Sequence, residues 1–571
     1  MCSRGGKCYF LRSPRSLYAC SLKAVSYHFR HVRSLILESP ESVRFDIFAE
    51  LYDQGWMSLL WNELSCVSTF LSLLRVGDRR TRLHRIFQSV IDHGNPIHTT
   101  LTNKLYLLIK SNPSDYKEST LNFSSFLSEA GWFAEARKLL FPYYNPSSPC
   151  PIVLLSLLHN VSAYCEFAEA SDYMSLLKVT PHPHPAAVYC QFSSSCFDKS
   201  EYPEAFRWSR LAIQSLSNDL PIKVVIDVLR QSSKSYVIRR QFSKAKMLIL
   251  EAILLSKETY GEWHPKYADC LLDYGYYLLN ADRVIKSLQA YQSALEVRLK
   301  CFGSQNLQVA FALEGLAYTT YVNQYNTGQF ERAKSHAEKA IGIMNNLLPK
   351  SHLLLASSQR VLALILEEIA VDHADEDISR NLLNQAESLH RSAIQLSIKS
   401  FGEVNVQTAK HYGNLGRLNQ SMRRYAKAEK MHLKAIEIKE KLLGNDDHEV
   451  ALSVGHLASL YTYDLKEYSK AELLYLRSIE IGIKLFGPGY SGLEYDYRGI
   501  IRVYQEIEDW PNYFVYTYKL REWEELQGLR NHDEVTKACF SKGDPLPLSS
   551  IIQALDDNGM EDSYCSSNVR N

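Results

Sequence analysis

The sequence lacks the features that would assign the chain to a membrane, a disulfide scaffold or a common enzyme class. No apolar run approaches the roughly 18 residues that a bilayer span needs, so we expect no membrane span. The twelve cysteines are scattered and form no CxxC pair, which predicts free thiols in a reducing compartment. HExxH, P-loop, GxSxG and protein-kinase motifs are all missing. We therefore expect a protein without catalysis of its own, and without a metal or other cofactor.

The chain also lacks an excess of charge of either sign. Its 571 residues include 64 Lys and Arg and 63 Asp and Glu, a net charge of +1 at pH 7. Nucleic-acid-binding proteins usually carry a basic surface, so this balance argues against a nucleic acid as partner. The 36 Tyr and 22 Phe residues suit helix packing and aromatic-lined grooves instead.

A repeated pattern with a period of 42 or 43 residues in its clearest copies, between Val406 and Gly487, organises the chain. Each copy has a large residue, a small residue three positions later, another small residue at ten and, in most copies, Gly at nineteen. The copies are Phe242, Ala245, Ala252 and Gly261; Val284, Ser287, Ala294 and Gly303; Phe330, Ala333, Ala340 and Pro349; Leu383, Ala386, Ala393 and Gly402; Tyr425, Ala428, Ala435 and Gly444; and Tyr468, Ala471, Ser478 and Gly487. Weaker copies begin at Tyr202 and Phe133.

This spacing has a physical explanation. Positions three and ten residues after the first mark lie near one face of a helix, where small side chains let a neighbouring helix approach. Gly at the last mark permits positive φ and ends the helix. A period of about 34 residues is typical of tetratricopeptide repeats, and the longer unit is typical of kinesin light chains. The sequence therefore predicts an all-α tetratricopeptide-repeat solenoid of about 42-residue helical hairpins with an N-terminal helical module.

Breaks in the pattern predict six segments. Residues 1–15 form an unstructured basic tail, residues 16–94 the helical module, and residues 95–186 degenerate helical repeats. The repeat array spans residues 187–487, a helical cap spans residues 488–535, and a disordered tail spans residues 536–571. Within the array, the acidic stretch 371–380 is expected to be a loop between two helices.

The first helix of each hairpin normally lines the inner, concave wall of such a solenoid. Polar side chains on that wall suit an extended peptide, and charge-assisted hydrogen bonds to it contribute about 1.5–3 kcal/mol each. The candidate peptide-binding residues are Asp273, Glu314, Arg360, Asn414, His456 and Asp496. Taken singly, each of them is also explained as a solvated side chain, and Asp273 as one that only bonds a neighbouring helix; taken together, they favour a peptide-binding wall. An Arg on the peptide requires a carboxylate partner, for which Asp273 is the first candidate and Asp496 the second.

Four unusual stretches carry a resemblance to a known family. They are HPKYADCLLDYGYYLLN from His264, HLLLASSQRVLALILEEIA from His352, NVQTAKHYGNLGRL from Asn405 and GYSGLEYDYRG from Gly489. From about residue 34 to 529, the chain resembles the amyloid protein-binding protein 2 family of kinesin-light-chain-like repeat proteins. The first fifteen residues and the C-terminal tail do not share this resemblance.

The resemblance implies a substrate-recognition adaptor. The family looks like a set of substrate receptors of a cullin-2 ubiquitin ligase, which bind elongin C and elongin B and recognise degrons at substrate C-termini. It is also linked to the cytoplasmic tail of amyloid precursor protein and to microtubules, so a transport adaptor on microtubules or kinesin is the alternative, and a passive scaffold a third. A cytoplasmic location is implied, with the nucleus, the cytoskeleton and the periphery of membranes as further options.

The same resemblance gives the N-terminal module a function. An elongin-binding box is a helix of pattern [S/T/A/P]-L-x-x-x-C-x-x-x-aliphatic, and a cullin box downstream contains L-P-x-x-aliphatic. The residues that fit the elongin pattern are Ser16, Leu17, Ser21 and Val25, with Ser21 where Cys is usual. Those that fit the cullin pattern are Pro40 and Val43, with Ser39 in place of Leu. Leu17 is the expected anchor of a helix-in-groove contact.

Overall fold

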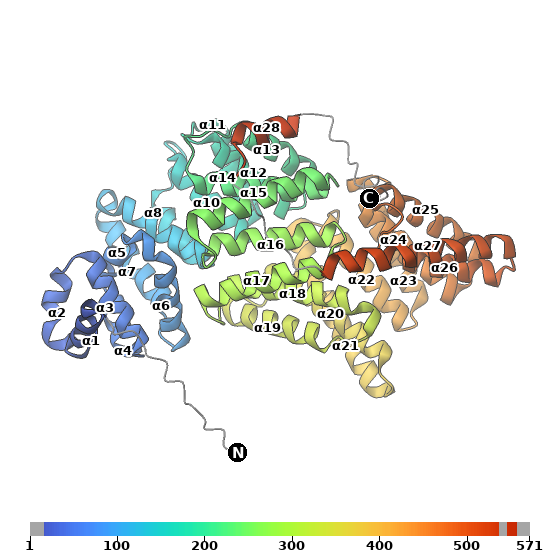
Figure 1. Ribbon diagram of the computed structural model, residues 1–571, viewed down its shortest axis with the longest axis horizontal. Coiled ribbons are helices and arrows are strands. Elements are labelled where there is room, and N and C mark those ends of the chain that lie inside the picture. The colour runs from blue at the N-terminus through green and yellow to red at the C-terminus, as the bar shows by residue number, and fades with distance from the viewer. Residues whose placement is uncertain (1–15, 536–544, 557–571) are drawn as a thin grey trace, which may run out of the picture. The chain divides into compact units, whose positions relative to one another are not determined.

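In the computed structural model, which describes residues 16–535 and 545–556, the chain folds into helices and connections (Figure 1). No strand occurs in these ranges, and the predicted all-α class is confirmed. The chain divides into two compact units, Met1–Leu127 and Ser128–Asn571. The basic tail predicted for residues 1–15 lies outside the described residues.

The N-terminal unit is a bundle of short helices around an aromatic core. Its helices are α1 (Leu17–Tyr27), α2 (Phe29–Glu38), α3 (Glu41–Asp53), α4 (Met57–Leu64), α5 (Val67–Leu74), α6 (Arg80–Asp92), α7 (Ile97–Ser111) and α8 (Pro113–Glu129), which leads into the second unit. Phe70 and Phe87 pack against Phe123 and Phe126, with ring centroids 5.3 to 5.7 Å apart. Because α8 supplies half of this core, the unit extends past residue 94, where the sequence placed the end of the module.

Among the described helices, no single one is long and apolar enough to cross a bilayer. The bent pair α4 and α5, whose axes meet at 95°, has the necessary length and composition, and these two properties alone support it as a span.

The second unit is a stack of helical hairpins, as predicted. It begins with α9 (Phe133–Leu140). The hairpins are α10 (Pro151–Ala163) with α11 (Phe167–Val179), α12 (Pro185–Asp198) with α13 (Tyr202–Gln214), α14 (Ile222–Ile238) with α15 (Phe242–Tyr260), α16 (Pro265–Asn280) with α17 (Val284–Phe302), α18 (Leu307–Gln324) with α19 (Glu331–Leu347), α20 (Leu354–Asp372) with α21 (Glu376–Phe401), α22 (Val406–Ser421) with α23 (Tyr425–Leu443), α24 (His448–Ser459) with α25 (Tyr468–Phe486), and α26 (Leu493–Glu506) with α27 (Trp510–Val535). Hairpins therefore continue on both sides of the array predicted for residues 187–487.

The marks of the repeat have defined places in these hairpins. The first mark opens the second helix, as Phe242, Val284, Tyr425 and Tyr468 do in α15, α17, α23 and α25. The small residues of all six copies are at most 4% exposed, because they lie where helices approach most closely. The glycines that end α15, α17, α21, α23 and α25 have φ between 74° and 89°, a conformation that other residues rarely adopt.

The acidic stretch 371–380 differs from its predicted loop. The helix α20 continues to Asp372 and α21 begins at Glu376, so only residues 373–375 connect them. Asp375 accepts hydrogen bonds from the amides of Asp377 and Ile378, at 2.9 and 3.1 Å. Acidic residues in a first turn are favoured by the helix dipole. The acidity of this stretch therefore marks a helix start.

Part of the predicted C-terminal tail is also helical. Within residues 536–571, the structure describes residues 545–556, which contain α28 (Leu548–Asp556). Its Ile551 and Leu555 are buried. The expectation of disorder does not hold for this segment, because its apolar residues recur at helical spacing and find a surface to cover.

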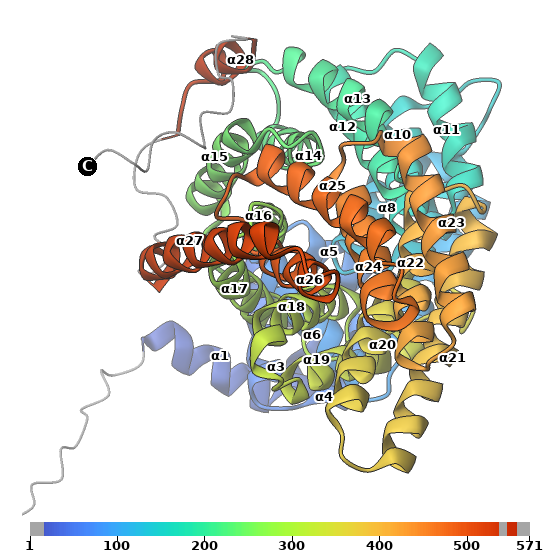
Figure 2. The same ribbon diagram turned by 90° about the vertical axis from the view of Figure 1, so that its right-hand side faces the viewer.

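The hairpins wind into a superhelix whose successive turns touch (Figures 1 and 2). The connection inside one hairpin meets the start of the first helix five hairpins later. Asn405 donates to the carbonyl of Lys199 at 2.9 Å, and the Ser491 amide donates to Asp282, also at 2.9 Å. The rings of Tyr164 and His352 lie 4.3 Å apart at an equivalent place.

Asparagine is suited to these junctions because its amide is both acceptor and donor. Asn306 accepts from the Gln308 amide at 2.8 Å, which caps α18, and donates to the Ala130 carbonyl at 2.9 Å. Asn405 caps α22 in the same way while bonding Lys199. One side chain thus starts a helix and joins two turns of the superhelix.

The seam between α22 and α23 allows a direct test of close packing. Ala435 is fully buried. A Cβ added at Gly413 would lie 3.7 Å from the Cβ of Ala435. We expect Ala435→Trp to lower the free energy of unfolding by about 1–3 kcal/mol or more, because the larger ring must push the helices apart. Denaturant unfolding measures this. Leu433→Trp on the same helix is the control, since Leu433 is 48% exposed. Equal unfolding midpoints for both variants would show that the seam has been misassigned.

Candidate functional site

The first helices of the hairpins form the inner wall of the superhelix. Consecutive first helices such as α14 and α16, α16 and α18, and α20 and α22 contact one another, while each second helix packs on its own partner (Figure 2). The six candidate peptide-binding residues lie on six successive first helices: Asp273 on α16, Glu314 on α18, Arg360 on α20, Asn414 on α22, His456 on α24 and Asp496 on α26.

Asp273 belongs to a charge cluster between α14, α16 and α17. Its Oδ2 accepts from Arg230 Nε at 2.9 Å, and its side chain is only 13% exposed. Arg230 also pairs with Asp227, which accepts from Lys266 at 2.7 Å. Burial alone would raise the pKa of Asp227, but Lys266 and Arg230 outweigh it and lower this pKa to about 2. The carboxylate of Asp273 is thus already neutralised by a cation of the chain itself.

Glu314 differs from Asp273 in its partners. Its Oε2 accepts a hydrogen bond from Ser358 Oγ at 2.6 Å, and among the described residues it makes no ion pair. Tyr291 lies near both carboxylates. Burial raises the pKa of Tyr291, and the negative charges of Asp273 and Glu314 raise it further. Glu314 is therefore the candidate acid whose charge remains available for a ligand.

Arg360 and Asn414 lie half-buried on the same wall. The Arg360 guanidinium lies over the ring of Tyr318, 5.1 Å from its centroid, a cation–π contact. Arg360 therefore presents a cation beside an aromatic surface, which suits a planar or acidic group on a ligand.

Two further charged clusters on this wall were not predicted. Arg417 pairs with Glu367 at 3.1 Å and with Glu368 at 3.2 Å, and Ser421 donates to Glu367. Burial raises the pKa of Glu367 even with Arg417 beside it.

In the second cluster, Lys410 and Lys439 both pair with Glu449, at 2.8 and 3.1 Å. Burial would raise the pKa of Glu449, but the two lysines outweigh it and hold this pKa well below its usual range. The three N–H donors of the buried Lys439 are all taken by Glu449 and Ser453, so the half-buried Lys410 is the cation of this cluster that a ligand can reach.

Asp496 does not lie on the open wall. It is 6% exposed in the seam between α24 and α26, where Ser478 Oγ donates to it at 2.7 Å. Gly455 leaves room for it, since a Cβ there would lie 2.9 Å from its Oδ1. Burial raises the pKa of Asp496 to about 7. This placement suits a structural carboxyl group better than a ligand contact.

Histidines gather where α21 to α24 meet. His390 and His432 are fully buried, and neither ring nitrogen of either residue has a hydrogen-bond partner among the described residues. His456 stacks near His432, with ring centroids 6.3 Å apart, and contacts Tyr495. Burial lowers the pKa of His432 to about 3, with Arg417 and Lys439 adding to the effect. These rings are therefore held neutral.

Glycines in the first helices make room for large side chains of the second helices. Tyr291 lies against Gly275, where a Cβ would be 2.8 Å from its ring, and His432 lies against Gly416, at 3.0 Å. Both large residues stand seven positions after the first mark of their repeat. That offset, together with Gly in the preceding helix, is the sequence signal that would have found them.

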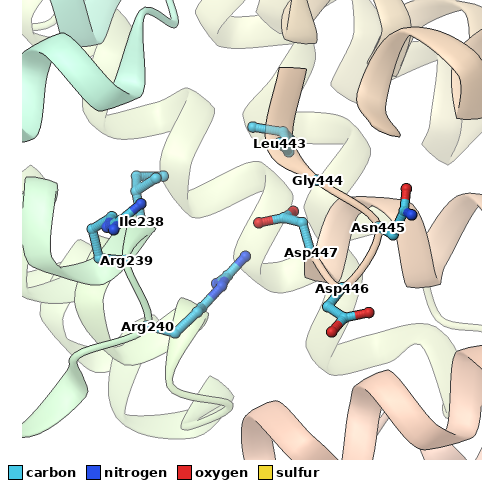
Figure 3. A pocket seen from close by; sticks show the side chains of 8 residues that line it. All are labelled: Ile238, Arg239, Arg240, Leu443, Gly444, Asn445, Asp446 and Asp447. Atoms are coloured by element: carbon cyan, nitrogen blue, oxygen red, sulfur yellow. The ribbon is translucent and has the colours of Figure 1, made fainter. Parts of the chain in front are cut away.

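A cavity of about 500 Å³ lies where two superhelical turns meet. Ile238 at the end of α14, with Arg239 and Arg240 of the α14–α15 connection, faces residues 443–447, from the end of α23 to the start of α24 (Figure 3). Arg240 points toward Asp447 across it. Burial raises the pKa of Asp447, although Arg240 opposes this effect. This cavity belongs to the junction between turns.

The candidate elongin- and cullin-binding residues lie at the start of the N-terminal unit. Ser16 caps α1, Leu17 is 84% exposed and Ser21 is exposed, whereas Val25 is half-buried. Pro40 is the exposed N-cap of α3, and Val43 lies half-buried in its first turn. In the described part of the chain, no group of three or more His, Cys, Asp or Glu side chains is placed to hold a metal ion.

Comparison with known proteins identifies relatives along nearly the whole chain. The tetratricopeptide repeat family model matches residues 380–441 and 407–484. Amyloid protein-binding protein 2 from Mus musculus is 45% identical over 542 residues, which cover 90% of this chain and 92% of that protein. The Rattus norvegicus protein of the same name has the same identity and coverage.

Solved structures resemble the chain less closely. BtubC (BKLC) from P. vanneervenii is 16% identical, covers 47% of this chain and 96% of its own, and has a TM-score of 0.30. A Rap protein complexed with competence and sporulation factor is 14% identical. The match covers 64% of this chain and 97% of the Rap protein, with a TM-score of 0.41.

The buried histidines predict acid sensitivity. Unfolded histidine titrates near pH 6.5, whereas folded His432 has a pKa of about 3, so between these values only the unfolded chain binds the proton. Stability is therefore lost as the pH falls below about 6.5. We expect His432→Leu to reduce the loss of unfolding free energy between pH 7 and 5.5 by about 1 kcal/mol. Urea unfolding at both pH values measures this, with His31→Leu, at an exposed position, as control. If His432→Leu loses as much unfolding free energy between pH 7 and 5.5 as the wild type, the buried neutral His432 is not a source of the acid sensitivity.

Proposed function

The chain belongs to the amyloid protein-binding protein 2 family, and we propose that it is a non-catalytic adaptor that presents substrates to a ubiquitin ligase of cullin-2, elongin B and elongin C. The observation that carries this proposal is the extent of the similarity, 45% identity over 90% of the chain. That length exceeds either compact unit alone, so it includes residues of both. The N-terminal unit would hold the ligase and the array would hold the substrate.

The exposure of Leu17 supports the first half of this division. A leucine that is 84% exposed on a capped helix loses nothing inside the protein when it enters an apolar groove of a partner. The helix itself is fixed, because the Tyr18 hydroxyl donates to Asp46 of α3 at 2.6 Å. Leu17, flanked by Ser16 and Ser21, is the proposed anchor for elongin C, and Pro40 and Val43 the proposed contacts for cullin-2.

The charges of the inner wall support a peptide end as the substrate. Lys410, the more exposed of the two lysines that pair with Glu449, suits the terminal carboxylate of a protein chain. Glu314, without a cation of its own among the described residues, suits an Arg or Lys on the same peptide. Asp273 becomes the weaker candidate for this contact because Arg230 already pairs with it.

A transport adaptor remains the second candidate function. The relatives are named for binding amyloid protein, and the same wall would take the cytoplasmic tail of amyloid precursor protein. In that case microtubules or kinesin replace elongin C and cullin-2 as partners. Both functions place the chain in the cytoplasm, with the nucleus, the cytoskeleton and the periphery of membranes as further sites. Affinity purification of the intact chain distinguishes them by which partners are recovered.

Substitution of Leu17 tests the ligase function. We expect Leu17→Glu to abolish co-purification of elongin C, because a carboxylate cannot enter an apolar groove without a large desolvation cost. Leu473→Glu is the matched control, since Leu473 is 70% exposed on α25 of the other unit. If Leu17→Glu retains elongin C at the level of Leu473→Glu, the box at residues 16–25 is not the binding site.

A double-mutant cycle tests the inner wall. We expect Glu314→Gln to weaken an Arg-bearing peptide by about 1.5–3 kcal/mol, roughly ten- to a hundredfold, and to affect the same peptide with Ala much less. Titration of both peptides against both proteins gives the coupling energy. Asp273→Asn, in which Arg230 keeps Asp227 as a partner, is the comparison variant. Coupling near zero at Glu314 with strong coupling at Asp273 would show that Asp273, the first candidate from the sequence, is the carboxylate that binds the peptide Arg.

A further inference from the structure

The C-terminal helix α28 is seated on the outside of the repeat array, far along the chain from the helix it contacts. It is the isolated red helix at the top of Figure 2, separate from α26 and α27. Ile551 is fully buried and Leu555 is 7% exposed, while Leu548 and Ile552 are half-buried. Positions i, i+3, i+4 and i+7 form one apolar face, which is the face that α28 hides.

Two side chains of α15 hold the ends of this segment. Glu251 Oε2 accepts from the backbone amide of Leu546 at 2.9 Å, just before α28 begins. Lys244 Nζ donates to the carbonyl of Leu555 at 2.9 Å, in the last turn. Lys244 and Glu251 lie seven residues, or about two helical turns, apart on α15. The segment therefore runs antiparallel to α15.

The charges of this pair match the polarity of a helix. Carbonyls of a last turn have no partner inside their own helix, and a lysine there is also favoured by the helix dipole. An acid at the opposite end complements the amides that precede the first turn. Glu251 is 7% exposed, and among the described residues it makes no ion pair. A buried acid that bonds only a backbone amide of the docked segment has a reason to be there when that segment is bound.

We propose that the face of α15 marked by Lys244 and Glu251 is a docking site for a short amphipathic helix of a partner protein, with apolar residues in the spacing of α28, and that α28 occupies this site in competition. The contacts at both ends are to backbone atoms, so they fit any helix of this length and direction. The apolar spacing then selects the partner. This surface lies outside the inner wall and does not depend on the ligase function.

A nine-residue helix is too short to be stable alone in water, so α28 is helical because it is docked. Its tether gives it a high effective concentration at the site, which a free helix must overcome. The site is therefore largely closed to partners until α28 leaves.

The test uses a fluorescein-labelled peptide of residues 545–556 and the full-length chain. Ile551→Asp with Leu555→Asp releases α28 in the chain, and Gln553→Asp, at an exposed position of α28, is the matched control. We expect the released variant to bind the peptide at least tenfold more tightly than the wild type and the control. Adding Lys244→Glu and Glu251→Lys to the released variant exchanges the charges at the two ends of the site. We expect this change to abolish binding.

Hydrogen–deuterium exchange distinguishes release of α28 from unfolding of the repeat array. In the released variant, amides 548–556 should lose protection while those of α14 and α16 keep it, which shows that the array remains folded. Equal and tight peptide binding by the wild type and the released variant would show that α28 does not compete. No binding to a released variant whose array is folded would overturn the docking site.

Discussion

Close approach of helices at small side chains is the constraint on which the repeat array depends. Alanine or serine at two places in each of the six second helices that carry the repeat is almost fully buried, and glycines in the first helices leave room for rings such as Tyr291 and His432. Each hairpin can then lie against the next with little gap, and the dispersion and hydrophobic terms accumulate along the stack. A larger side chain at one of these places separates two hairpins and shifts every later one.

Tight stacking makes successive turns of the superhelix meet. Where hairpins five places apart touch, the charged groups of the inner wall become partly buried, and most of them pair within the chain. This explains why Asp273 pairs with Arg230 and why Glu367 and Glu368 share Arg417. Glu314, which lacks such a partner among the described residues and accepts only from Ser358, is the exception.

The two units distribute exposed and buried apolar groups in different ways. In the N-terminal unit, the aromatic core around Phe70 is closed, yet Leu17 remains on the surface of a fixed helix. In the repeat array, the apolar face of α28 is covered by a surface of the same chain. The structure thus leaves Leu17 open to a partner, whereas the apolar face of α28 is already covered.

The sequence by itself determined the all-α class, the hairpin period, the start of most second helices and the left-handed glycines, because these follow from local spacing and backbone conformation. It also placed Asp273, Glu314, Arg360, Asn414 and His456 on first helices, since the register of one repeat carries over to the next. Only the tertiary structure decided which of these carboxylates is free. Arg230 reaches Asp273 from the preceding hairpin, and Ser478 holds Asp496 in a seam, contacts between residues 43 and 18 positions apart. The contacts between turns and the docking of α28 join residues 176 to 311 positions apart, and no local pattern encodes them.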